Sequence, residues 1–182
     1  LVVQLGHKLV QLAAPGVPDV YQGTEVPFPT LVDPDNRRPV DFAARADLLD
    51  RLDAGHTPGL DDPAAAKLAV VAGVLRARRD RPELFTGHRP LDVSGPAADH
   101  AIAFDRGGAL AVATRWPVRL AAAGGWGETV VTVPAGRWED AVTGHPVHPD
   151  ARGAVRLDEL LSTLPVALLV PAKRDARQES GA

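Results

Sequence analysis

Apolar residues recur three or four positions apart in the first twelve residues, which is the spacing of one helix face: Leu1, Leu5, Leu9, Val10 and Leu12. The pair Pro15-Gly16 ends this pattern. A second helix is predicted around leucines 48, 49 and 52, closing near Gly55. A third is predicted to start at Asp62-Pro63, where an acidic N-cap precedes a proline at the first helical position. It ends in arginines 76, 78, 79 and 81, which predict a solvated helix end that complements the helix dipole.

Strand patterns are concentrated in the second half of the chain. Before it, only residues 17–21 predict a short buried strand, because they are β-branched and aromatic and lie between glycines. A loop rich in Pro, Asp and Asn follows over residues 23–39. Beyond residue 90, four strands are predicted, separated by turn sequences: 101–104, 109–114, 129–133 and 166–170. Short strands with regular turns are typical of an antiparallel sandwich, so we predict a boundary between helical and β parts near residue 90.

Composition narrows the class of protein. Among 182 residues, 45% are hydrophobic and 24% charged, as in soluble globular proteins. The formal net charge of -3 offers no cationic field, so neither nucleic acid nor a membrane is expected as a partner. The absence of cysteine excludes disulfides and thiolate metal sites and fits a cytoplasmic protein. The polar residues 173–182 are predicted to form a flexible tail.

The start of the chain is unusual. The sequence contains no methionine, and it opens inside an apolar helical pattern with no capping residue ahead of it. We expect from this that the chain is a fragment, truncated at its N-terminus. A processed or trimmed N-terminus is the alternative.

Two consecutive motifs in the loop carry a family resemblance. Residues 15–25 contain Gly-Val-Pro, then Tyr21, then Gly-Thr-Glu, which resembles the final barrel strand of the α-amylase superfamily. Residues 33–41 read Asp-Pro-Asp-Asn-Arg-Arg-Pro-Val-Asp, which resembles the maltooligosyltrehalose synthase family in particular. Further matches follow in that family's order, so the resemblance covers nearly the whole chain: residues 79–85, 125–129, 136–140 and 160–169.

This resemblance implies a fold. It predicts the C-terminal portion of a (β/α)8 barrel followed by an antiparallel β-sandwich. On this interpretation, residues 1–90 end the catalytic barrel with its last strand, loop and helices. Residues 91–172 form the sandwich, and residues 173–182 form the tail.

The resemblance also implies an activity. Such enzymes are isomerases of trehalose biosynthesis that convert the reducing-end α-1,4 linkage of maltooligosaccharides to an α,α-1,1 linkage. Net retention requires a nucleophile and an acid/base carboxyl about 5–5.5 Å apart. In the family these carboxylates follow earlier barrel strands, which this sequence lacks. The isolated chain is therefore predicted to be inactive, with no catalytic residue, cofactor or metal of its own.

Two other functions stay open. One is a stand-alone carbohydrate-binding module built on the β-sandwich, which would need a complete, capped fold beginning near residue 90. The other is a fragment of a different α-amylase-family hydrolase or transglycosylase. The barrel-like residues 1–89 argue against the module.

The loop holds the candidate substrate-binding residues. A sugar site combines an aromatic face with amide, carboxylate and guanidinium groups that bond hydroxyls in pairs. The residues of these types at the predicted barrel mouth are Tyr21, Gln22, Glu25, Asp35, Asn36 and Arg37. A structural interpretation competes with this one. Residues 33–36 could form a turn whose side chains bond the local backbone, with Arg38 pairing a carboxylate.

Two further groups of residues suggest weaker hypotheses. His145 and His148 flank a proline and have no third ligand nearby, so no metal site is predicted there. Trp116, Trp126 and Trp138 could form a carbohydrate platform, but the sequence favours core or edge anchors of the sandwich.

Overall fold

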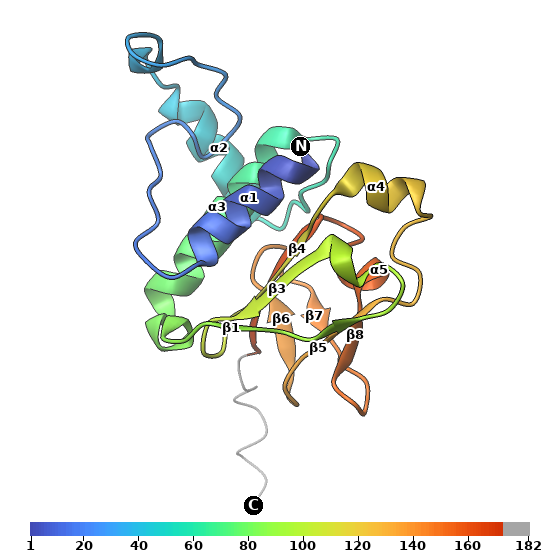
Figure 1. Ribbon diagram of the computed structural model, residues 1–182. Helices are drawn as coiled ribbons and strands as arrows, with labels where there is room; N and C mark the ends of the chain where they lie inside the picture. Colours follow the sequence, from blue (N-terminus) through green and yellow to red (C-terminus); the bar gives the residue numbers. More distant parts are fainter. Residues whose placement is uncertain (173–182) are drawn as a thin grey trace, which may run out of the picture.

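The computed structural model describes residues 1–172, in which three long helices precede a set of short strands (Figure 1). The predicted tail at 173–182 lies outside the described residues. The α and 3-10 helices are α1 Val2–Ala13, η1 Asp35–Arg37, α2 Phe42–Asp53, α3 Pro63–Asp80, η2 Pro82–Phe85, η3 Ala98–His100, α4 Pro117–Ala122 and α5 Leu157–Leu160. The strands are β1 Arg89–Pro90, β2 Val93–Ser94, β3 Ala101–Asp105, β4 Leu110–Thr114, β5 Val130–Thr132, β6 Trp138–Asp140, β7 Pro146–Val147, β8 Ala154–Arg156 and β9 Val166–Pro171.

Local capping explains where α2 and α3 begin. The Asp62 carboxylate accepts hydrogen bonds from the amides of Ala64 and Ala65, and Pro63 occupies the first helical position. Asp41 caps α2 in the same way, by accepting from the amide of Ala44. The three predicted long helices are therefore confirmed.

All strand pairs are antiparallel and form two sheets. A six-stranded sheet has the order β1-β3-β4-β9-β6-β7, and a three-stranded sheet has the order β2-β5-β8. The predicted turn at residues 105–108 joins β3 to β4. The Asp105 carboxylate accepts from the amides of Gly107 and Gly108, both of which have positive φ. The mixture of helices and antiparallel sheet expected from the sequence is confirmed.

Strand β4 explains how the layers stack, because all five of its residues are buried. Ala111 and Ala113 face one apolar cluster, shared with Leu5, Leu9 and Val70 of helices α1 and α3. Leu110 and Val112 face the opposite cluster, shared with residues of the three-stranded sheet. The six-stranded sheet thus lies between the helices and the smaller sheet (Figure 1). One core crosses the boundary predicted near residue 90.

The strand predicted at residues 17–21 is not formed within residues 1–172, where these residues belong to no sheet. Val17 is 96% exposed, and the part of the chain that the structure describes offers residues 17–21 no strand to pair with. A strand is stable only beside another, so strand-forming composition alone does not create one.

The sequence predicts a solvated cluster of arginines at the end of α3. In the structure, one of these arginines binds the main chain of another helix. Arg78 donates to the main-chain oxygens of Leu12, Ala14 and Gly16, at the C-terminal end of α1. Arg106, from the β3–β4 turn, donates to the oxygen of Ala13 at the same helix end. Both guanidinium groups lie within 6 Å of the Phe85 ring centre. Helix α1 contains no basic residue in its last turn, so distant arginines supply the positive charge.

No helix within residues 1–172 combines the length and apolar character needed to cross a membrane.

Candidate functional site

The candidate residues lie on the long connection between α1 and α2. This connection leaves the helices and reaches away from both sheets, with η1 at its far end (Figure 1). It has two halves, residues 21–28 and residues 31–38, which the structure stabilises in different ways.

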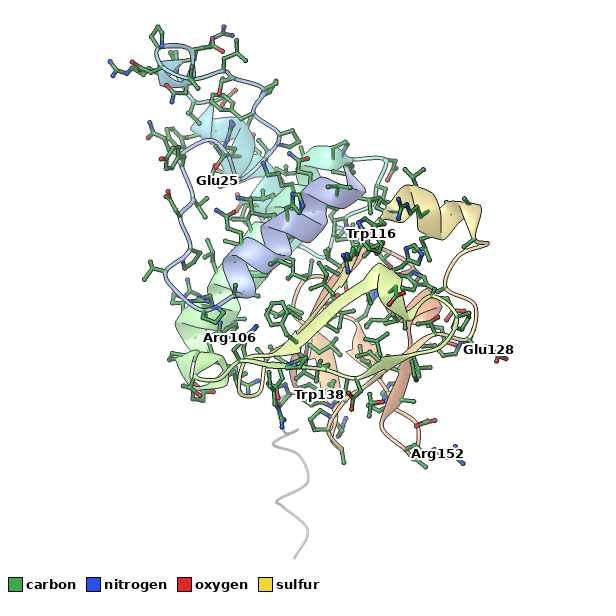
Figure 2. All side chains as sticks on the ribbon, in the orientation of Figure 1. Glu25, Arg106, Trp116, Glu128, Trp138 and Arg152 are labelled. Atoms are coloured by element: carbon green, nitrogen blue, oxygen red, sulfur yellow. The ribbon has the colours of Figure 1, made fainter. Side chains whose placement is uncertain are left out.

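The first half is a tight turn fixed to the helices below it. Tyr21 and Gln22 are exposed, and the main-chain oxygen of Tyr21 accepts from both the amide and the hydroxyl of Thr24. Glu25 is partly buried beside α2 (Figure 2), and its Oε2 lies 3.7 Å from Nε of Arg45. The structure therefore presents the aromatic ring and the amide outward and turns the Glu25 carboxylate inward.

The second half is held by its own side chains. Asp35 Oδ2 accepts from the amide of Leu31 at 2.8 Å, and its other oxygen pairs with Arg38. Arg37 pairs through Nε with Asp33, while its side chain stays 76% exposed. Asn36 is exposed between them. The structure thus has the predicted pairing of Arg38 with a carboxylate, while contact between these residues and a sugar stays a prediction.

The two halves are not joined directly. Among residues 1–172, no hydrogen bond or ion pair links residues 21–25 with residues 33–38. The six candidate residues therefore form two separate groups on one connection, and a shared ligand would have to bridge them.

Three carboxylates of this connection lie beside arginines. Glu25 faces Arg45, Asp33 pairs with Arg37, and Asp35 pairs with Arg38. Each of these carboxylates thus holds an arginine in place, and the two pairs of the second half stand at the surface.

Two positioning groups escaped the sequence reasoning, Arg45 on α2 and Lys67 on α3. Arg45 donates to the oxygen of Gly23 at 2.7 Å, and Lys67 donates to the oxygen of Val26 at 3.2 Å. Burial lowers the pKa of the Lys67 ammonium, as does nearby Lys8, while Glu25 opposes the shift. Both contacts join residues more than twenty positions apart, so no local sequence pattern predicts them.

The tryptophans divide into two environments. Trp138 is 6% exposed and donates through its indole nitrogen to Pro134, and Trp126 packs partly buried against the core between the sheets. Trp116 is 44% exposed, and the guanidinium of Arg115 stacks 3.5 Å from its ring centre. The prediction of core anchors is confirmed for Trp138.

His145 and His148 line a surface hollow of about 620 Å³, and residues 1–172 contain no group of three potential metal ligands.

Comparison with known proteins identifies relatives of this arrangement. No family model matches the chain. The chain is 47% identical, over 169 residues, to a Mycobacterium tuberculosis protein named "Putative maltooligosyl trehalose synthase". That alignment covers 91% of this chain and 20% of the relative.

Solved structures give the same result. The maltooligosyltrehalose synthase from Arthrobacter ramosus is 57% identical, with a TM-score of 0.87 over 94% of this chain and 22% of that one. A structure described as DSM5389 glycosyltrehalose synthase is 26% identical, with a TM-score of 0.67 over 93% of this chain and 20% of that one. The resemblance predicted from the loop motifs is confirmed, and the chain spans about a fifth of these relatives.

Proposed function

We propose that this chain, which is similar over more than nine-tenths of its length to maltooligosyltrehalose synthases, supplies sugar-holding groups to such an enzyme. The enzyme would convert the reducing-end α-1,4 linkage of a maltooligosaccharide to an α,α-1,1 linkage. The carboxylates that break and form the glycosidic bond would lie in the remaining four-fifths of the longer protein. The partner of this chain is then a maltooligosaccharide, bound in the intact enzyme.

The exposed Arg37 side chain is the observation that carries this proposal. Asp33 engages its Nε, and the rest of the side chain extends into solvent. A guanidinium held on one side presents its remaining donors as a preorganised fork that can bond two neighbouring hydroxyls. Asn36 beside it offers both a donor and an acceptor.

The proposed reaction explains why groups that hold the released glucose affect the products. After the first bond breaks, the released glucose must stay bound, turn, and present its anomeric hydroxyl to the covalent intermediate. Water competes for that intermediate, and attack by water gives free glucose instead. Groups that hold the released glucose therefore favour isomerisation over hydrolysis.

The fold belongs to the same proposal. We infer that residues 17–21 take the place of the last strand of a (β/α)8 barrel whose other strands lie in the rest of the longer protein. The exposure of Val17 and Tyr21, and the lack of a neighbouring strand for this segment within residues 1–172, support this. The two sheets with a common apolar cluster support the β-sandwich interpretation of residues 91–172. A self-standing module from residue 90 onward is disfavoured, because its sheet would lose the helices that cover one face.

Replacing Arg37 tests the proposal in a full-length enzyme that contains the residues of this chain, called the longer enzyme below. We expect Arg37→Ala to lower the ratio of trehalose-type product to free glucose about tenfold or more. A hydrogen bond to a charged group contributes roughly 1.5–3 kcal/mol, and about 1.4 kcal/mol corresponds to a factor of ten. The measurement is product analysis with maltopentaose as substrate. Arg51→Ala, at an exposed position of α2, is the matched control and should leave the ratio unchanged.

The competing turn interpretation predicts a different result. If Arg37 only braces the turn, its loss should lower both products together and reduce the melting temperature. A variant with the parent's product ratio at full activity would show that residues 33–38 do not hold the sugar.

A further inference from the structure

Arg45 makes three polar contacts with the chain around the first half of the connection. Its side chain is only 15% exposed, although it lies near the start of a surface helix. One terminal nitrogen donates to the oxygen of Gly23 at 2.7 Å, and the other to the oxygen of Asp41 at 2.9 Å. The third nitrogen, Nε, faces Glu25 at 3.7 Å. The guanidinium also lies 5.7 Å from the centre of the Phe28 ring.

The backbone beneath these contacts has little room to move. Gly23 has a φ of +85°, and a Cβ atom there would lie 2.8 Å from a methyl of Val40. Three residues later, the oxygen of Val26 accepts from Lys67, which is 6% exposed. Two cationic side chains from two different helices thus fix the carbonyls of residues 23 and 26.

The Glu25–Arg45 pair is incomplete as it stands. Glu25 Oε2 and Arg45 Nε are both buried, and neither has a hydrogen-bond partner among the described residues. Their separation of 3.7 Å is just beyond hydrogen-bonding distance. Arg45 therefore contacts Glu25 by charge alone, and its two hydrogen bonds go to main-chain oxygens.

We propose that Arg45 is a positioning residue that fixes residues 21–25, so that Tyr21 and Gln22 meet the sugar in one orientation. Arginine suits this role because its planar group points donors in several fixed directions: here it donates to the oxygens of Gly23 and Asp41, and its Nε faces Glu25. Holding contact groups in place beforehand reduces the ordering that binding would otherwise require. The inference rests on the proposed function, since it assumes that the first half contacts the saccharide.

Hydrogen exchange on the 182-residue chain tests the structural half of this inference. In Arg45→Met, we expect the amide of Thr24, which donates to the oxygen of Tyr21, to exchange at least tenfold faster, while the amides of α3 and β4 keep their rates. Arg45→Lys should fall in between, because an ammonium can make one of the contacts but not all three. The control variant Arg51→Met replaces an exposed arginine on the same helix and should leave these exchange rates unchanged. If Arg45→Met unfolds the whole chain, Arg45→Lys must still show the local increase. Unchanged exchange of the Thr24 amide in the folded variants would overturn the inference.

Kinetics in the longer enzyme test the functional half. A positioning role predicts that Arg45→Met raises KM for maltopentaose and lowers the share of trehalose-type product, with partial rescue in Arg45→Lys. Tyr21→Ala serves as the direct contact variant. If Tyr21→Ala changes these quantities and Arg45→Met does not, the inference about Arg45 fails while the proposed function stands. If neither variant changes them, the proposed sugar contact of this half fails as well.

Discussion

Arg106→Met should lower the free energy of unfolding by about 4 kcal/mol, which is one of the largest effects expected of a single substitution in this chain. Arg106 is 4% exposed, and its guanidinium donates to the main-chain oxygens of Ala13, Phe85 and Gly87. Hydrogen bonds from a charged donor contribute about 1.5–3 kcal/mol each, and methionine supplies none.

The contacts of Arg106 explain the size of this effect. They join the turn between β3 and β4 to the end of α1 and to the segment after η2, so one side chain ties the helices to the sheet (Figure 2). No carboxylate pairs with it in the part of the chain that the structure describes, so carbonyl dipoles and the face of the Phe85 ring stabilise its charge. Burial lowers the pKa of Arg106, and the neighbouring Arg78 lowers it further.

Denaturant unfolding of purified variants measures this prediction. Arg152→Met is the matched control, because Arg152 lies in an exposed turn and its side chain points to solvent (Figure 2). The free energy of unfolding of Arg152→Met should stay within about 0.5 kcal/mol of the parent value. A loss below about 1 kcal/mol in Arg106→Met would mean that the hydrogen bonds of Arg106 are not what holds the helices to the sheet.

Asp140→Ala should lower the free energy of unfolding by about 3 kcal/mol, whereas Asp140→Asn should lower it by less than about 1 kcal/mol. The carboxylate of Asp140 is buried where β6 ends. It accepts from the amides of Val142 and Leu168 at 3.1 and 2.9 Å, and from the Thr143 hydroxyl at 2.6 Å. Alanine would leave these buried donors without a partner, and each such loss costs about 1–3 kcal/mol.

Asparagine keeps the shape and one acceptor oxygen. That oxygen can serve both amides, while the new NH₂ group can donate to the oxygen of Thr143. Burial raises the pKa of Asp140, with the surrounding donors opposing the shift, so the site does not favour the negative charge. Equal destabilisation in the two variants, measured by denaturant unfolding, would show instead that the charge itself is required.

The extent to which the sequence predicted the fold depends on how local each signal is. Asp62 and Pro63 start α3 through contacts within four residues, so the sequence predicts that helix directly. Strands β3 and β4 are also predictable, because each has five residues and a glycine turn joins them. Strands β1, β2 and β7 have only two residues each, too few to show an alternating pattern.

The candidate site shows the same limit. The loop motifs indicated the family, and the arginine partner of Asp35 was foreseeable from residues three apart. The contact between Arg45 and Gly23 spans 22 positions, and that between Arg106 and Ala13 spans 93. The sequence around an arginine in a helix or a turn looks the same whether the side chain faces solvent or binds a distant carbonyl. These two cases are distinguished only by how α1 and α2 pack against their neighbours.

If this chain holds sugar for a reaction whose carboxylates lie elsewhere, it has no activity by itself, and an assay of the isolated chain tests this most directly. The purified 182-residue chain is incubated with maltopentaose, and the loss of reducing ends and the release of glucose are followed over time. We expect no turnover of either kind, because binding groups alone do not replace a missing nucleophile and acid/base. Formation of a non-reducing product in proportion to the amount of chain added would contradict this expectation.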